Sequence, residues 1–464
     1  MSAHSGSMHR QAPWPWRRSL AWLALLAPLF YLTYGLANWW ALERWNAGLV
    51  PTVVFDWEHH IPFWDWTVFP YWSINAFYGL SLFLSRSKHR IDRHAARLLT
   101  AQFIAVSCFV LWPLRFSFGQ PEAHGAAGFL FTALRGFDQP FNQAPSLHIA
   151  LAIILWDWYR PLMRRAWQRV LLHVWTFAIC ASVLTTYQHH FIDIPTGALL
   201  GVLCVWLWPL EREVALPSAW RLSRDPQRLK LAALYLVGAA GCLAVALWWG
   251  GAGLWLAWPA ASLALVALNY LGFGARGFRM DRQGRMHWSA RWLLAPYRLG
   301  AALNAWAWTR GLPPRVEVVP GVWLGRRPNH AEWLAAGQPA LVSLCAELPL
   351  HAAARPVSRC LPLLDLVVPS PGRLQRAAHL VQAQRDAGPG GPIWVCCALG
   401  FSRSAAAVVA WQLLHQDVPD LAEAEARTRR ARPQLVLGPA WLGALKQLAA
   451  LRPAENTGDT ASAG

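Results

Sequence analysis

Hydrophobic residues form long uninterrupted runs over the first 273 positions and short, spaced runs after about residue 316. Each long run has roughly the length that crosses the hydrocarbon core of a bilayer as an α-helix. An eighth, weaker run at 144–159 contains His148 and Asp157. The pattern predicts an all-α polytopic membrane bundle of about eight spans, six of them within 20–210 and two more within 211–273. The seven stronger runs are 20–42, 67–84, 98–114, 170–187, 194–210, 231–250 and 254–272.

Composition supports a membrane protein. Hydrophobic residues make up 55% of the chain and charged residues only 14%, which excludes a disordered or fibrous protein. The chain also contains 31 Trp, whose indole rings favour the boundary between hydrocarbon and water. Arg10, Arg17 and Arg18 precede the first run, as in a signal peptide, but the run is too long for one and lacks a cleavage site at 38–40. We therefore predict that it is retained as a span.

The charge of the loops predicts the orientation. The segment before residue 20 and those at 85–97, 160–169 and 211–230 hold seventeen Lys or Arg, whereas those at 43–66, 115–143, 188–193 and 251–253 hold three. The positive-inside bias places the N-terminus (1–19) and everything after Gly272 in the cytoplasm of a multi-pass inner or plasma membrane protein. Most of the net charge of +18 then faces the anionic inner leaflet, and no nucleic-acid partner is predicted.

Two short segments on the predicted outer side carry reactive residue types. His148 lies where the fourth span begins, and His189 and Asp193 lie where the fifth ends. Because His189 and Asp193 are four residues apart, a helical turn would bring the carboxylate to the imidazole and raise its basicity. Such an imidazole can attack phosphorus while a second one protonates the leaving oxygen. The structural alternative is that these histidines only hydrogen-bond within the bundle or lie in its interfacial belt.

These segments resemble a known family. Pro145-Ser-Leu-His148, followed by His189-x3-Asp193, is similar to the second and third motifs of the type 2 phosphatidic acid phosphatase superfamily, especially its inositol-phosphoceramide-synthase-like branch. The resemblance implies that His189 forms a phosphohistidine, that Asp193 orients it, and that His148 is the general acid of a lipid phosphatase or phosphotransferase. Leu147, where phosphatases commonly have Gly, favours transfer.

The phosphate-binding residues of this site are less well marked. The family's first motif, Lys-x6-Arg-Pro, is absent as written. Arg115 and Arg135 are the candidate phosphate-binding cations, because they lie in the segment where that motif belongs. Ser146, within the second motif, is a further candidate phosphate-binding residue.

Residues 274–315 form a basic connector. Eight Arg face a single acid, Asp281, and aromatic residues are interleaved with them. The stretch 288–308 predicts a basic amphipathic helix in the headgroup region of the inner leaflet. A solvated linker is the alternative. A helix at the membrane surface would hold the last domain close to lipid.

From residue 316 short apolar strands alternate with helices, which predicts an α/β domain over 316–452 and a disordered tail at 453–464. Strands are expected at 342–344, 361–364 and 393–396, and a helix at 373–385. The last strand leads into a seven-residue loop from Cys397 to Arg403 and then into an apolar helix. Such a loop cradles anions, stabilises a thiolate at its start and presents Arg403 to phosphate oxygens. The structural alternative is an apolar strand with a small-residue turn.

Cys397-x5-Arg403 with a following Ser404 resembles the signature of the cysteine-dependent protein tyrosine and dual-specificity phosphatases, over about 316–452. The resemblance implies that Cys397 attacks phosphorus, Arg403 binds the phosphoryl group and Ser404 assists loss of the thiolate. It also implies a general acid on an upstream loop, where Asp365 is the candidate. The His that usually precedes the nucleophile is Cys396 here.

The loop interior indicates the substrate. It contains no Lys or Arg, unlike loops built for polyphosphoinositides, so a single phosphomonoester on a phospholipid headgroup or a phosphoprotein is expected. The residues expected to bind phosphate are Ala398, Leu399, Gly400, Phe401 and Ser402.

The leading hypothesis is a bifunctional membrane enzyme with an outward-facing histidine site and a cytoplasmic cysteine site. Both reactions would use a covalent phosphoenzyme without a metal or other cofactor. In the alternative, the cytoplasmic domain binds phosphoprotein, or acts as a protein phosphatase, and regulates a lipid phosphotransferase. A third possibility is a transporter with an appended phosphatase. The oligomeric state is left open.

Overall fold

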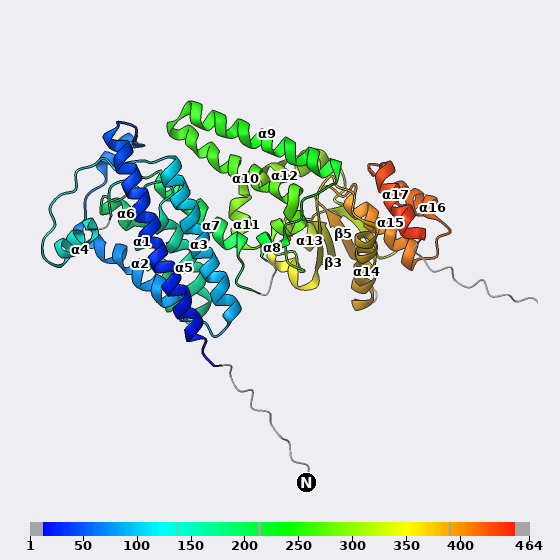
Figure 1. Ribbon diagram of the computed structural model, residues 1–464. Coiled ribbons are helices and arrows are strands. Elements are labelled where there is room, and N and C mark those ends of the chain that lie inside the picture. The colour runs from blue at the N-terminus through cyan, green and yellow to red at the C-terminus, as the bar shows by residue number, and fades with distance from the viewer. Residues whose placement is uncertain (1–12, 137, 212–214, 389–390, 451–464) are drawn as a thin grey trace, which may run out of the picture. The chain divides into compact units, whose positions relative to one another are not determined.

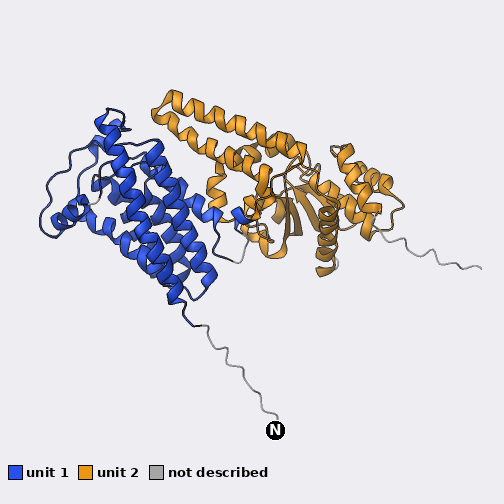
Figure 2. Cartoon of the chain, viewed as in Figure 1, with its two compact units in different colours: residues 1–218 blue, residues 219–464 orange. Residues whose placement is uncertain are grey.

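The computed structural model describes residues 13–136, 138–211, 215–388 and 391–450. The chain forms two compact units, residues 1–218 and 219–464, which are coloured separately in Figure 2. The tail predicted at 453–464 and most of the predicted cytoplasmic N-terminus lie outside the described residues.

The first unit is a bundle of α-helices (Figure 1). Its helices are α1 (Trp16–Asn46), α2 (Val68–Ser81), α3 (Lys88–Leu111), α4 (Gly125–Arg135), α5 (Leu147–Tyr159), α6 (Ala166–Thr185) and α7 (Asp193–Leu207), and the unit ends within α8 (Leu216–Ala219). α1, α3 and α6 are long and apolar enough to cross a membrane. α2, α5 and α7 also form at predicted spans, but with only 14, 13 and 15 residues.

Two glycines let α5 and α7 pack closely. A Cβ atom on Gly197 would overlap the carbonyl oxygen of Ser146, and one on Gly201 would lie 2.7 Å from that of Ala150. Such contacts leave no room for a side chain, so the two backbones approach directly. Because His148 is in the first turn of α5 and Asp193 begins α7, this packing brings the two histidine motifs together.

The second unit begins with a pair of packed apolar helices, α9 (Pro226–Trp249) and α10 (Ala257–Leu268). α9 and the apolar segment Gly251–Phe278, which contains α10, complete the five helices of the described chain that could cross a membrane. The count of eight spans and their orientation stay predictions.

The connector differs from the single helix predicted over 288–308. It forms two helices, α11 (Trp288–Leu293) and α12 (Ala295–Thr309). Pro296 lies in the first turn of α12 and has no backbone N–H, so the hydrogen-bond ladder of α11 cannot continue through it. Leu299, Leu303 and Trp306 of α12 are exposed, as is typical of a helix that lies in a membrane interface.

The C-terminal part of this unit is an α/β domain on a five-stranded sheet of order β1-β2-β5-β3-β4. All neighbouring strands are parallel except β1 and β2. The predicted mix of strands and helices is confirmed, although β1 and β2 were not predicted, and β1 begins one residue before the predicted boundary. The strands are β1 (Arg315–Val319), β2 (Val322–Arg326), β3 (Ala340–Cys345), β4 (Arg359–Leu363) and β5 (Ile393–Cys397); the helices are α13 (His330–Ala335), α14 (Pro371–Ala387), α15 (Arg403–His415), α16 (Leu421–Ala431) and α17 (Pro439–Ala450).

The central strand β5 is buried on both faces. Val395 and Cys397 face the core formed with α14 and α15, where Leu374 and Val408 are fully buried. Cys396 points to the opposite face and packs with Trp333. This double burial fixes the end of β5, from which the cysteine loop continues.

Candidate active sites

Three strand ends meet at the cysteine loop. Cys397 is the last residue of β5, Glu347 follows β3, and Asp365 follows β4. These strands are parallel, so their carboxyl ends lie on one edge of the sheet, where α/β proteins bind ligands. The sequence predicted Cys397 and Asp365 at this site but missed Glu347.

The loop surrounds the Cys397 thiol with donors. The backbone N–H of Gly400 and the hydroxyl of Ser404 both donate to Cys397 Sγ, at 3.2 Å each. Gly400 has a φ of 82°, and a Cβ atom there would overlap the backbone of Gly325, so only glycine fits. Arg403 begins α15, which directs the helix N-terminus at the loop. The two donors and the helix N-terminus are therefore directed at the Cys397 sulfur.

Arg403 is buried and held by carboxylates. Its Nη1 and Nη2 donate to Glu347 at 2.9 and 2.7 Å, and Nη2 lies 2.9 Å from Asp365 Oδ1. Although burial by itself lowers the pKa of Arg403, Asp365 and Glu347 raise it well above its usual value. Burial raises the pKa of Glu347, but Arg403 outweighs this and holds it below its usual value. The bidentate pair thus fixes a permanently charged guanidinium at the base of the loop.

The carboxyl of Asp365 has a raised pKa although it contacts Arg403. Burial raises the pKa of its carboxyl above the usual range, against the pull of Arg403, and the Glu347 carboxylate adds to the rise. The Asp365 side chain is 31% exposed. The site therefore places an accessible carboxyl with a raised pKa beside the cysteine loop.

Cys396 does not take part in the site. It is a free thiol on the opposite face of β5, and burial raises its pKa, as does the neighbouring Cys397 to a smaller degree. A thiol held in this protonated form is a poor nucleophile. Of the two adjacent cysteines, Cys397 is the one whose sulfur lies at the loop.

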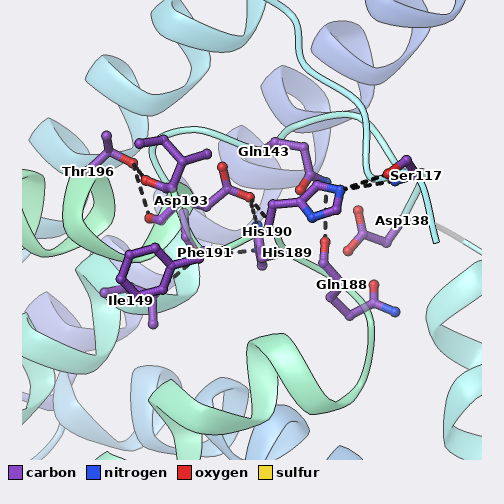
Figure 3. Close-up of polar contacts among 12 residues, drawn as sticks. Ser117, Asp138, Gln143, Ile149, Gln188, His189, His190, Phe191, Asp193 and Thr196 are labelled. Carbon is purple, nitrogen blue, oxygen red and sulfur yellow. Dashed lines mark hydrogen bonds and ion pairs between the residues drawn. The ribbon is translucent and has the colours of Figure 1, made fainter. Parts of the chain in front are cut away.

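The histidine site lies in the first unit, at the junction of α5 and α7. His189 Nδ1 is 3.1 Å from Asp193 Oδ2, and its Nε2 is 3.3 Å from Ser146 Oγ. His189 and Asp193 are buried, and Figure 3 shows them with their polar neighbours. His189 therefore lies between the Asp193 carboxylate and the Ser146 hydroxyl, one at each ring nitrogen.

His148 faces the same cavity as His189. Their ring centroids are 6.3 Å apart, and the His148 ring stacks on Tyr71 at 4.0 Å. The cavity, of about 190 Å³, is also lined by Asp138, whose carboxylate accepts a hydrogen bond from Tyr34 at 2.8 Å. The structure thus brings both predicted histidines to one cavity.

The two candidate phosphate-binding cations, Arg115 and Arg135, do not line this cavity. The Arg115 guanidinium stacks over Trp45 at 4.0 Å, and Arg135 is the exposed last residue of α4. Among the described residues, those lining the cavity include no Arg or Lys. The roles of Arg115 and Arg135 stay predictions.

A buried carboxylate missed by the sequence analysis supports this site. Glu58 accepts hydrogen bonds from the backbone N–H of Phe191 at 2.9 Å and contacts His190 Nδ1 at 3.0 Å. The backbone N–H of His190 donates to Asp193 Oδ2 at 3.1 Å, so this network holds the segment that carries the dyad. An acid next to two histidines at 58–60 was the only signal in the sequence.

Potential metal ligands are not grouped. In the described part of the chain, no three His, Cys, Asp or Glu side chains are arranged to hold a metal ion.

Comparisons with known proteins cover part of the chain. No protein-family model and no curated protein matches it. Human DUSP28 is similar, with 24% identity, 30% of this chain and 94% of that chain covered, and a TM-score of 0.27. Tk-PTP in its active form is 25% identical over 30% of this chain and 98% of that chain, and PTPMT1 in complex with PI(5)P is 18% identical over 30% and 96%, each with a TM-score of 0.27. Function is therefore inferred from the geometry of the two sites.

Proposed function

We propose that the chain is a membrane-attached phosphatase whose cysteine site hydrolyses a phosphomonoester through a phosphocysteine. The observation that carries the proposal is the Cys397 thiol, which accepts hydrogen bonds from Gly400 and Ser404 beside the fixed guanidinium of Arg403. The nucleophile and the anion-binding loop come from the end of β5, and the acid comes from the end of β4 on the same edge of the sheet. This places them around one phosphoryl group, as a displacement at phosphorus requires.

In the first step, the Cys397 thiolate attacks phosphorus and the bond to the ester oxygen breaks. Asp365 gives its proton to that oxygen, so the alcohol leaves neutral. In the second step, Asp365 takes a proton from water, the water oxygen attacks phosphorus, and the S–P bond breaks. The Ser404 hydroxyl donates to the departing thiolate, and inorganic phosphate is released.

The charge of the loop supports a substrate with one phosphate group. Its interior residues, 398–402, carry no Lys or Arg, so Arg403 is the cation of the loop that faces phosphate. A phospholipid headgroup and a phosphoprotein both offer such a group.

The pH dependence tests the acid. Because the pKa of Asp365 is raised, its protonated form persists to higher pH, and activity should decline on the alkaline side as it ionises. In Asp365→Asn, we expect kcat for an alkyl phosphomonoester to fall about 10²-fold and this alkaline decline to disappear. pH–rate profiles of the full chain measure both effects. Asp386→Asn, on an exposed residue of α14, is the matched control, and an unchanged alkaline limb in Asp365→Asn would refute the assignment.

A second function is supported by the histidine site, which we propose to be a lipid phosphatase or phosphotransferase. The observation that favours it is the Asp193–His189 pair facing His148 across one cavity. His189 Nε2 would attack phosphorus, and the bond to the leaving oxygen would break as His148 protonates it. Water or an alcohol would then take the phosphoryl group. If the cysteine site hydrolyses no phosphomonoester, the alternative role of its domain is that of a phosphoprotein-binding regulator of the histidine site.

A further inference from the structure

A cavity of about 380 Å³ adjoins the cysteine loop within the second unit. At one end it reaches Glu347, Asp365 and the loop residues Ala398 and Leu399. The remaining walls come from α9, α10, α12 and the loop that carries Asp365. The residues are Tyr235 of α9, Pro259 and Leu263 of α10, Leu366 of that loop, and Pro296, Tyr297, Gly300, Ala301 and Asn304 of α12.

We propose that this cavity holds the apolar part of a membrane lipid whose headgroup ends in a phosphomonoester, so that the substrate of Cys397 is a lipid. The proposal rests on the phosphatase function above and names its substrate class. The phosphate would bind the loop at Arg403, and the adjoining part of the lipid would lie against Leu263 and Ala301.

The origin of the walls favours a lipid over a protein. Tyr235 lies in α9, and Pro259 and Leu263 lie in the segment Gly251–Phe278; both are long and apolar enough to cross a membrane. A phosphoprotein presents a polar phosphorylated segment, which gains little from apolar walls beside the loop. A lipid enters such a cavity from the bilayer, and its hydrocarbon gains from contact with the apolar walls.

The loop that carries Asp365 is hydrogen-bonded to the same two apolar segments. The hydroxyl of Tyr270 donates to the backbone carbonyl of Asp365 at 3.0 Å, and Gln227 Nε2 donates to the carbonyl of Leu366 at 3.4 Å. Tyr235 lies 5.5 Å from Tyr270 between ring centroids. α9 and the segment Gly251–Phe278 therefore hold the loop that carries the general acid. The same two segments line the cavity, so the bound lipid would lie next to Asp365.

α12 connects the loop to the membrane surface. Ala301 and Ala302 pack against Ala398, next to Cys397, whereas Leu303 on the other side of the helix is exposed. A helix with one face on the active-site loop and an apolar face outward holds that loop at a membrane interface.

Positive charge gathers beside α12. A neighbouring cleft of about 480 Å³ is lined by Arg291, Arg298, Arg327 and Arg355 and by no acid among the described residues. Burial, together with Arg291 and Arg327, lowers the pKa of Arg298, so its charge is not balanced locally. A cluster of basic residues at this place attracts an anionic membrane surface.

The test compares a lipid with a soluble substrate. The full chain, carrying His189→Ala to silence the histidine site, is reconstituted in vesicles containing long-chain phosphatidic acid. Phosphate release from the vesicles is compared with release from a water-soluble aryl phosphate and from a phosphotyrosine peptide. We expect Ala301→Trp, which fills the cavity, to lower the lipid-to-aryl activity ratio at least tenfold. Leu263→Trp narrows the cavity from its other wall and should lower the same ratio, so the test does not depend on one variant.

Leu334→Trp is the matched control, because this exposed residue of α13 neither lines the cavity nor belongs to the outward apolar face of α12. Its ratio should equal that of the parent protein. An equal fall of both activities in the two cavity variants, or a peptide hydrolysed in preference to lipid, would overturn the lipid assignment alone. If the parent protein hydrolyses none of the three substrates, the proposed phosphatase function fails together with the lipid assignment.

Discussion

Replacing Cys397 by serine is expected to abolish hydrolysis of aryl phosphate by the full chain. The serine hydroxyl keeps the shape of the loop but cannot supply a thiolate, so the covalent step is lost and kcat should fall by at least about 10³-fold. Because Gly400, Ser404 and Arg403 remain in place, the variant should still bind substrate or a phosphate analogue with little change in affinity.

Cys396→Ala is the matched control for this experiment. The side chain is adjacent in sequence but lies on the opposite face of β5, in the cluster with Trp333, so its removal should leave kcat/KM within a few-fold of the parent protein. Full activity in Cys397→Ser, or its loss in Cys396→Ala with the fold retained, would refute the assignment of the nucleophile.

Replacing His189 by alanine is expected to abolish turnover of lipid phosphate at the membrane site. His189 is the group held by Asp193 and Ser146 at the cavity, so its loss removes the nucleophile, and the rate should fall by about 10³-fold or more. The measurement uses the full chain with Cys397→Ser in vesicles containing phosphatidic acid, so that only the membrane site can act. Release of inorganic phosphate measures hydrolysis, and labelled phosphate on an added alcohol measures transfer.

His173→Ala is the corresponding control. This residue lies on α6, where its Nδ1 accepts a hydrogen bond from Trp156 Nε1 at 2.9 Å. It does not contact the His189–Asp193 pair, so its variant should keep the rate of the parent protein. Unchanged lipid phosphate turnover in His189→Ala would contradict the enzymatic role and favour a transporter or a structural role for the first unit.

Local sequence spacing predicted which residues lie together at the two candidate sites. Cys397, Gly400, Arg403 and Ser404 belong to one loop between a strand and a helix, so their spacing fixes their geometry. The same holds for His189 and Asp193, which are one helical turn apart. Interactions across the sheet were not predictable, because Glu347 meets Arg403 only through the strand order, which places β3 beside β5.

Other differences have similar causes. Glu58 contacts His190 across 132 positions of chain, and no periodic pattern records such a contact. The connector was expected as one helix because aromatic residues are interleaved with its basic ones, yet Pro296 divides it. β1 and β2 were missed because Arg315 and Glu317 interrupt the apolar run of β1, and Gly325 and Arg326 end that of β2, whereas β5 is apolar throughout. The lipid-facing cavity depends on the packing of α12 against the cysteine loop, which composition alone cannot show.

The central claim, a phosphocysteine enzyme, is tested most directly by trapping the intermediate. The full chain would be mixed with a ³²P-labelled phosphomonoester, quenched in denaturant within milliseconds, and digested so that the labelled peptide can be identified. The account predicts label on the peptide that contains Cys397, in a linkage with the pH stability of a thiophosphate, and no such label in Cys397→Ser. Rapid hydrolysis with no label at Cys397, or label that persists in Cys397→Ser while the histidine site is silenced, would contradict it.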